Sequence, residues 1–110
     1  MIPNIDVVLV LGDQIDEAGF SNDLHWKQYT QRLKSIFRIS TISPPLISIV
    51  GNHDTEFPRY LRKGLVDRYE NYIGSVNSVN VIKNVTFIGI NSLSLDTNPM
   101  DSSLREDTMR

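Results

Sequence analysis

Two apolar runs, each followed at once by glycine and polar residues, organise the first half of the chain. The first run covers residues 5–11 and leads into Gly12-Asp13, and the second covers residues 46–50 and leads into Gly51-Asn52-His53-Asp54. Residues 5–11 are apolar at both odd and even positions, so they predict a strand that is covered on both faces, as in a parallel sheet. Residues 46–50 predict a second strand.

The interval between the two runs predicts a loop and then a helix. Residues 12–23 contain several glycine, serine, asparagine and aspartate residues, which are typical of a loop. Over residues 24–37, apolar side chains recur at helical spacing. Residues 40–45 predict another loop, because Pro44-Pro45 stops a helix. A helix between two strands gives a right-handed β-α-β unit, so both glycine-led loops leave the same edge of a parallel sheet, where α/β proteins bind ligands.

The second half of the chain predicts one more helix and a hairpin. Residues 59–72 carry an apolar stripe at helical spacing, with Pro58 suited to the first turn. Residues 79–82 and 85–90 predict two strands of a β-hairpin joined by Lys83-Asn84. The fold class is therefore α/β, with one domain over residues 1–95. The polar tail, residues 96–110, shows no periodicity and is predicted to be disordered.

Composition narrows the range of functions. The 110 residues suffice for one domain, and the net charge of −2 without any basic run argues against nucleic-acid binding. The sequence has no cysteine, which excludes disulfides and thiolate metal sites. No apolar stretch approaches the roughly 20 residues of a transmembrane helix, and the first residues do not resemble a signal peptide. We therefore expect no transmembrane segment in this chain.

The residues that follow the two strands are suited to a metal site. Asp13 offers a carboxylate, Asn52 an amide oxygen and His53 an imidazole, which together suit hard divalent ions as well as Mn, Fe and Zn. Gly12 and Gly51 let the backbone turn sharply and approach a ligand closely. Taken singly, Asp13 is more readily explained as a loop residue or a helix cap than as a catalytic residue.

Two more acidic residues accompany this set. Asp16 can hydrogen-bond the imidazole of His53, which would raise the pKa of the histidine and suit it to act as an acid. Asp54 is expected to brace the loop and not to ligate a metal. The triplet Asn52-His53-Asp54 could alternatively have a purely structural role, as an Asx-turn. His25 is expected to be inert, and Trp26 and Tyr29 are expected to lie in the core.

Gly12-Asp13-Gln14-Ile15-Asp16 followed by Gly51-Asn52-His53-Asp54 resembles the second and third signature blocks of the calcineurin-like metallophosphoesterases. The resemblance implies that this chain is part of a sandwich of two sheets flanked by helices: the β-α-β unit, the second helix and the hairpin. It also implies two divalent metal ions and hydrolysis of a phosphate monoester or diester.

The resemblance assigns roles by position. Asp13 would bridge the two metals and Asn52 would ligate one of them. His53 would assist the leaving group, paired with Asp16. Gly12, Gly51 and Asp54 would support these residues.

Further stretches are similar to one membrane-anchored branch of that family, which removes ethanolamine phosphate from the mannose of GPI anchors. They extend the similarity over roughly residues 5–95: Leu11–Glu17, Ile36-Phe37, Phe57, Arg68-Tyr69-Glu70 and Ile90–Leu95. The branch implies a GPI-anchor glycan as substrate, and the membrane of the endoplasmic reticulum or Golgi as location.

Other features depart from the family pattern. The first family block, Asp-x-His, has no counterpart, because Asp6 is the only candidate and no histidine follows it by two residues. No histidine follows His53, although later family blocks contain several. We therefore expect weak or partial metal binding, little activity, and a chain that is an internal piece or a truncated product. The alternatives are a non-enzymatic fragment, a module that complements another chain, or an unrelated small α/β binding module.

Overall fold

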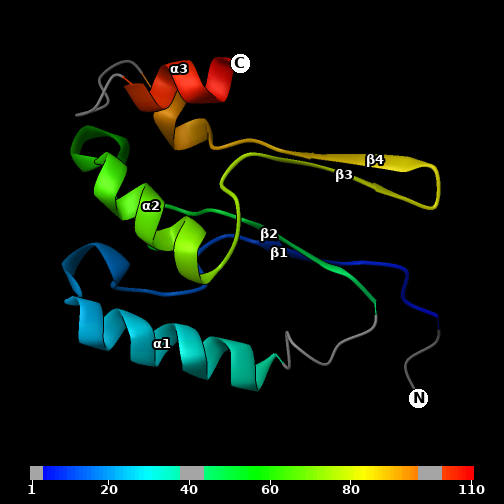
Figure 1. Ribbon diagram of the computed structural model, residues 1–110, viewed down its shortest axis with the longest axis horizontal. Coiled ribbons are helices and arrows are strands. Elements are labelled where there is room, and N and C mark those ends of the chain that lie inside the picture. Colours follow the sequence, from blue (N-terminus) through cyan, green and yellow to red (C-terminus); the bar gives the residue numbers. More distant parts are fainter. Residues whose placement is uncertain (1–3, 38–43, 97–102) are drawn as a thin grey trace.

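The computed structural model describes residues 4–37, 44–96 and 103–110. Figure 1 shows how its helices and strands are arranged. They are β1 (Val8–Leu11), α1 (Asp23–Ile36), β2 (Leu46–Ile49), α2 (Lys63–Tyr72), β3 (Ser78–Ile82), β4 (Val85–Gly89) and α3 (Ser103–Met109). Single 3₁₀ turns cover Ala18–Phe20, Pro58–Tyr60 and Ser92–Leu95.

The predicted β-α-β unit is confirmed. Strands β1 and β2 pair in parallel, with Val8 opposite Leu46 and Leu11 opposite Ile49. Helix α1 runs alongside the pair in Figure 1 and connects the two strands in sequence. Because the strands are parallel and in register, the segments that follow Leu11 and Ile49 emerge at the same edge of the sheet.

Helix α1 begins and ends within one residue of the predicted bounds. Asn22 caps its first turn, because the side-chain oxygen accepts a hydrogen bond from the backbone N–H of His25 at 2.9 Å. Trp26 and Leu33 are buried on its inner face, as expected. Tyr29 is 40% exposed, so the prediction that it lies in the core is wrong.

Helix α2 begins four residues later than predicted. Residues 58–60 form a separate 3₁₀ turn, and Arg62 has an extended backbone that interrupts the two segments. The break places Leu61, which is fully buried, in the core. Burial of one leucine is worth about 1.5–3 kcal/mol, which offsets the loss of one helical turn.

The predicted hairpin is confirmed. Strands β3 and β4 pair antiparallel, with Ile82 opposite Val85. Lys83 and Asn84 both adopt positive φ angles, of 49° and 64°, as in the two-residue turns that match the twist of a hairpin. The Lys83 ammonium forms an ion pair with Asp6, which connects the hairpin turn to the segment before β1.

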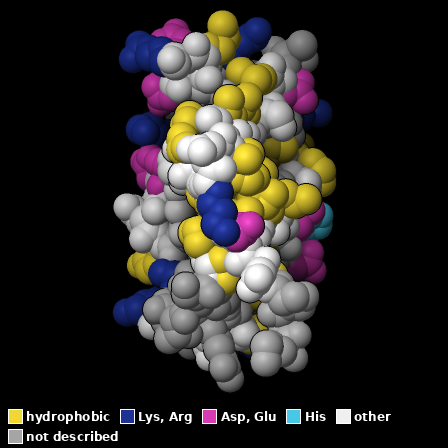
Figure 2. All heavy atoms as spheres, turned by 90° about the vertical axis from the view of Figure 1, so that its right-hand side faces the viewer, with side chains coloured by type: hydrophobic (Ala, Val, Ile, Leu, Met, Phe, Trp, Pro, Cys, Tyr) yellow, Lys and Arg dark blue, Asp and Glu magenta, His cyan; other side chains and the backbone are white. Residues whose placement is uncertain are grey.

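The sheet faces are more exposed than predicted. Strand β1 alternates between half-buried and exposed positions, with Leu9 43% and Leu11 75% exposed, so the expectation of burial on both faces is wrong. Val79 and Val81 on β3 are each 69% exposed. Figure 2, which views the end of the molecule that carries the β3–β4 turn, shows hydrophobic side chains gathered in a band. No described element covers these positions.

The tail is partly helical. Residues 103–109 form α3, so the prediction of disorder is wrong for them, and residues 97–102 lie outside the described residues. Leu104 is buried, and the Thr108 hydroxyl contacts the hydroxyl of Ser94 at 2.6 Å and accepts a hydrogen bond from the Asn77 amide at 3.1 Å. One apolar anchor and these polar contacts stabilise α3 without a regular hydrophobic stripe. The division of the chain at residue 95 stays a prediction.

The core is formed by residues of α1, α2 and α3, of the loops that leave β1 and β2, and of the segment before β3. Its buried members are Ile15, Ala18, Trp26, Val50, Leu61, Val66, Tyr69, Val76 and Leu104. The core therefore packs directly beneath the predicted site. Within the described part of the chain, none of the helices has the length and apolar character required to cross a bilayer.

Candidate functional site

Two glycines bring the loops after β1 and β2 into contact. Gly12 has a φ angle of 90°, and Asp13, with φ of 51°, is also in the left-handed region. A Cβ on Gly12 would lie 3.1 Å from Gly51 Cα, and a Cβ on Gly51 would collide with the carboxylate of Asp13. Both positions therefore require glycine, because any side chain would separate the strand ends.

Asp13 lies over the loop that follows β2. Its Oδ1 accepts a hydrogen bond from the backbone N–H of His53 at 3.1 Å, and the side chain remains exposed. The structure thus brings Asp13 and the 51–54 loop together, although 40 residues separate them. Asn52 belongs to the same loop, and its side-chain amide makes no hydrogen bond with any described residue.

His53 contacts Asp16 through one ring nitrogen. Its Nδ1 lies 2.9 Å from the Asp16 carboxylate and 2.9 Å from the Asp16 backbone carbonyl. The hydrogen bond to that carbonyl raises the pKa of His53, desolvation opposes it, and the charges of Asp13 and Asp16 raise the pKa further. Because both acceptors face Nδ1, that nitrogen donates, and Nε2 is the one available to an outside group.

Asp54 is buried and connects the two loops by hydrogen bonds; it is only 1% exposed. Its Oδ1 accepts hydrogen bonds from the backbone N–H groups of Gln14 at 2.6 Å and Ile15 at 2.8 Å. Its Oδ2 accepts a hydrogen bond from the backbone N–H of Gly51 at 2.9 Å. Burial raises the pKa of the Asp54 carboxyl, and the bonds from the three amides oppose that rise. A buried carboxylate with three backbone donors fixes loop geometry and has no free side toward a ligand.

A second support comes from residues to which the sequence analysis gave no role. Gln14 donates from Nε2 to the Ile49 carbonyl at 3.1 Å and to the Tyr69 hydroxyl at 2.9 Å. That hydroxyl also lies 3.0 Å from Ser48 Oγ. Tyr69 is fully buried, and burial raises its pKa. Gln14 and Tyr69 both fall in stretches that resemble the family, but the resemblance assigns neither of them a role.

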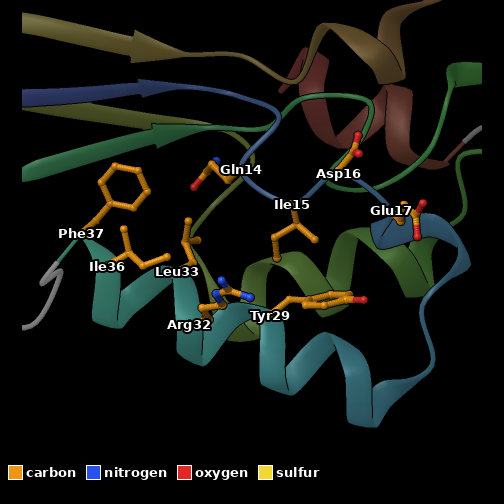
Figure 3. Close-up of a pocket in the computed structure, with 9 residues that line it drawn as sticks. All are labelled: Gln14, Ile15, Asp16, Glu17, Tyr29, Arg32, Leu33, Ile36 and Phe37. Atoms are coloured by element: carbon orange, nitrogen blue, oxygen red, sulfur yellow. The ribbon is translucent and has the colours of Figure 1, made fainter.

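The loop after β1 has an apolar side and a polar side. Figure 3 shows Ile15 directed at α1 and Asp16 directed away from that helix. Ile15 and Leu33 both line a cavity of about 370 Å³ between the loop and α1. Ile15 is 5% exposed and anchors the loop in the core. Ile15 therefore holds the loop against the core, and the next residue, Asp16, contacts His53.

The donor set suits a divalent ion only in part. The Asp13 carboxylate and the Asn52 amide offer the oxygen atoms that hard cations prefer, and the absence of a Cβ at Gly51 leaves the Asp13 carboxylate seated against the loop. Among the residues that the structure describes, no group of three or more histidine and acidic side chains is arranged to hold a metal. An ion bound by Asp13 and Asn52 would complete its coordination with water or with other protein ligands.

Comparison with known proteins gives one consistent result. The profile of the calcineurin-like phosphoesterases matches residues 2–107. The chain is 37% identical over 93 residues to the Metallophosphoesterase 1 homolog of Drosophila melanogaster, a match that covers 83% of this chain and 25% of that protein. It is 36% identical over 94 residues to Metallophosphoesterase 1 of Danio rerio, covering 84% of this chain and 24% of that protein.

A more distant relative belongs to yeast. The chain is 33% identical over 92 residues to Cell division control protein 1 of Saccharomyces cerevisiae, covering 81% of this chain and 18% of that protein. The chain therefore spans about a quarter or less of the relatives that it matches. No solved structure matches it significantly.

Proposed function

Because the chain belongs to the calcineurin-like phosphoesterase family, we propose that it forms part of a metal-dependent hydrolase of phosphate esters. The observation that carries the proposal is the convergence of Asp13 and the Asp16–His53 pair on one sheet edge. A carboxylate beside a histidine held by a second carboxylate suits phosphoester chemistry, which needs charge neutralisation and a proton for the leaving oxygen.

Each residue has a proposed task. Asp13 and Asn52 hold a divalent ion, and the family's ions are Mn, Fe or Zn by resemblance. When bound, such ions polarise the phosphoryl oxygens and lower the pKa of water. Asp16 orients His53 through Nδ1, so that Nε2 faces the leaving oxygen and gives it a proton. Asp54 keeps the loops at a fixed separation.

A more specific substrate is proposed from the stretches outside the two loops. The likeness of residues 68–70 and 90–95 to the GPI-remodelling branch supports ethanolamine phosphate on GPI-anchor mannose as the substrate. The same likeness supports the endoplasmic reticulum or Golgi membrane as the location. The names of the relatives support phosphoester hydrolysis but do not specify the substrate.

A second candidate function follows from the partial donor set. Two oxygen donors on the described residues leave most of the six or so positions of a hard ion unfilled. We propose, as the alternative, that the chain acts with protein segments that supply the remaining ligands, and that by itself it is not catalytic.

Hydrolysis assays separate these proposals. The chain alone, with Mn²⁺ added, is expected to show no measurable hydrolysis of bis-p-nitrophenyl phosphate, because two donors hold a metal centre poorly. A chimera can be made in which this chain replaces the matching quarter of the Drosophila melanogaster relative. This chimera is expected to hydrolyse the diester. In the chimera, His53→Ala should lower kcat by about 10²–10⁴-fold, the usual contribution of a general acid.

The other histidine provides the matched control. His25 lies exposed on α1, so His25→Ala should leave kcat of the chimera unchanged. A folded chimera whose rate is equally insensitive to both substitutions would count against the role of His53. Turnover by the chain alone that Asp13→Asn abolishes would show that the chain needs no further ligands.

A further inference from the structure

A second cavity lies where the two site loops continue beyond Asp16 and His53. It has a volume of about 580 Å³ and is lined by Gly19, Phe20, Glu56, Phe57, Tyr60 and Arg62. Pockets that bind organic ligands usually measure about 300–1,000 Å³. The cavity on the other side of the loop, against α1, shares none of these residues.

Three aromatic side chains in this cavity are exposed. Phe20 is 88% exposed, Phe57 56% and Tyr60 53%. The Phe57 ring centroid lies 6.3 Å from that of His53, so the cavity begins beside the histidine. Covering an exposed aromatic ring with another ring or apolar face lowers the free energy of the complex. The cavity therefore favours a ligand with a flat apolar face over one that is small and fully polar.

The backbone of the two loops that carry the cavity is held by contacts between them. A Cβ on Gly19 would lie 2.8 Å from the Thr55 carbonyl oxygen, so the two loops touch at that point. The backbone N–H of Ala18 donates to the His53 carbonyl at 3.1 Å. The Arg68 guanidinium donates to the Ala18 carbonyl at 2.5 Å and stacks over Trp26, with Cζ 4.7 Å from the ring centroid. Because these contacts already order the loop backbone, binding would mainly have to order the aromatic side chains.

Charged groups of both signs accompany the aromatic rings. Glu56 and Arg62 line the same cavity, and the Arg59 guanidinium lies 5.8 Å from the centroid of the Tyr60 ring. An apolar surface with a few polar groups is the usual design of a site for one organic group. The carboxylate and the guanidinium can accept from and donate to hydroxyl or amine groups on the edge of such a ligand.

We propose that this cavity is the subsite for the organic group of the phosphoester, and that Phe20, Phe57 and Tyr60 select esters whose alcohol carries a ring with an apolar face. The inference rests on the proposed function, which puts the leaving oxygen at Nε2 of His53. The Phe57 ring lies 6.3 Å from the His53 ring, which places the cavity within reach of an alcohol that leaves at that histidine. Esters of small alkyl alcohols would leave the aromatic rings uncovered.

Binding of two simple phosphates to ¹⁵N-labelled protein tests the proposal without requiring turnover. Phenyl phosphate should bind roughly fivefold to tenfold more tightly than methyl phosphate, as expected for one added aromatic contact. Its amide shifts should centre on Gly19, Phe20 and Phe57. Phe57→Ala and Tyr60→Ala should remove the difference in affinity. Phe37→Ala, which alters an exposed aromatic outside the cavity, should leave it intact.

Equal affinities for the two phosphates, or shifts centred elsewhere, would overturn the proposal. Should Phe57→Ala fail to fold, Phe57→Leu serves in its place, and it should reduce the preference for phenyl phosphate. If Mn²⁺ does not bind near Asp13 but phenyl phosphate is still preferred, the result would count against the proposed hydrolase and not against the cavity. If Mn²⁺ binds there but the two phosphates bind equally, only the proposal for the cavity would be overturned.

Discussion

Replacement of Asp54 by alanine is expected to lower the free energy of unfolding by about 3–5 kcal/mol, because it leaves three backbone N–H groups without their acceptor. Asp54 is 1% exposed, so water does not easily replace the carboxylate. For a small domain with a total stability of about 5–15 kcal/mol, such a loss approaches global unfolding. Urea denaturation followed by circular dichroism measures the effect.

Asp67 provides the control for this substitution. It forms an exposed ion pair with Lys63 at 3.0 Å on α2, so Asp67→Ala should cost less than about 1 kcal/mol. If Asp54→Ala unfolds at the same urea concentration as Asp67→Ala, then Asp54 does not fix the two loops, and the proposed geometry of the site loses its support.

Gly51→Ala is expected to lower the free energy of unfolding by about 2–4 kcal/mol, a range that combines overpacking with backbone strain. The new Cβ would lie 2.5 Å from the backbone nitrogen of Asp13 and would collide with its carboxylate. Backbone atoms cannot move aside as a flexible side chain can, so the two strand ends must separate. The substitution should therefore also displace Asp13 from the His53 N–H.

Gly64 is the matched control, because a Cβ there meets nothing within 4 Å. Gly64 lies in helix α2, where alanine in place of glycine should raise stability by about 0.5–1 kcal/mol. Opposite signs for the two glycine-to-alanine changes are therefore expected in one urea titration. A Gly51→Ala variant as stable as the wild type would show that the close approach of the two loops is not required.

The sequence pattern was sufficient for the arrangement of the elements that carry the site. Continuous apolar runs with a helical stripe between them predicted parallel strands, and parallel strands require that Gly12 and Gly51 emerge side by side. The contact between Asp16 and His53 followed from the same reasoning, because both loops leave one edge. These features depend on short-range periodicity and on the handedness of connections, which a single sequence displays.

Other features depend on tertiary contacts that no local pattern encodes. Helix α2 begins at Lys63, because the break before it lets Leu61 enter the core. Helix α3 has no repeating stripe and is held by the buried Leu104 and the contacts of Thr108. The exposure of Leu9 and Leu11 depends on what covers the sheet, and a strand's own residues do not specify its neighbours. The same holds for the link from Gln14 to Tyr69.

Titration of the ¹⁵N-labelled chain with Mn²⁺ tests the central claim most directly, since this paramagnetic ion broadens the signals of nearby nuclei. The claim is that Asp13 and Asn52 form one part of a metal centre at the paired strand ends. Amide signals of Gly12, Asp13, Gly51 and Asn52 should broaden first, Asp13→Asn should abolish that preference, and Asp67→Asn should not. Broadening spread evenly over the acidic surface, unchanged by Asp13→Asn, would contradict the account.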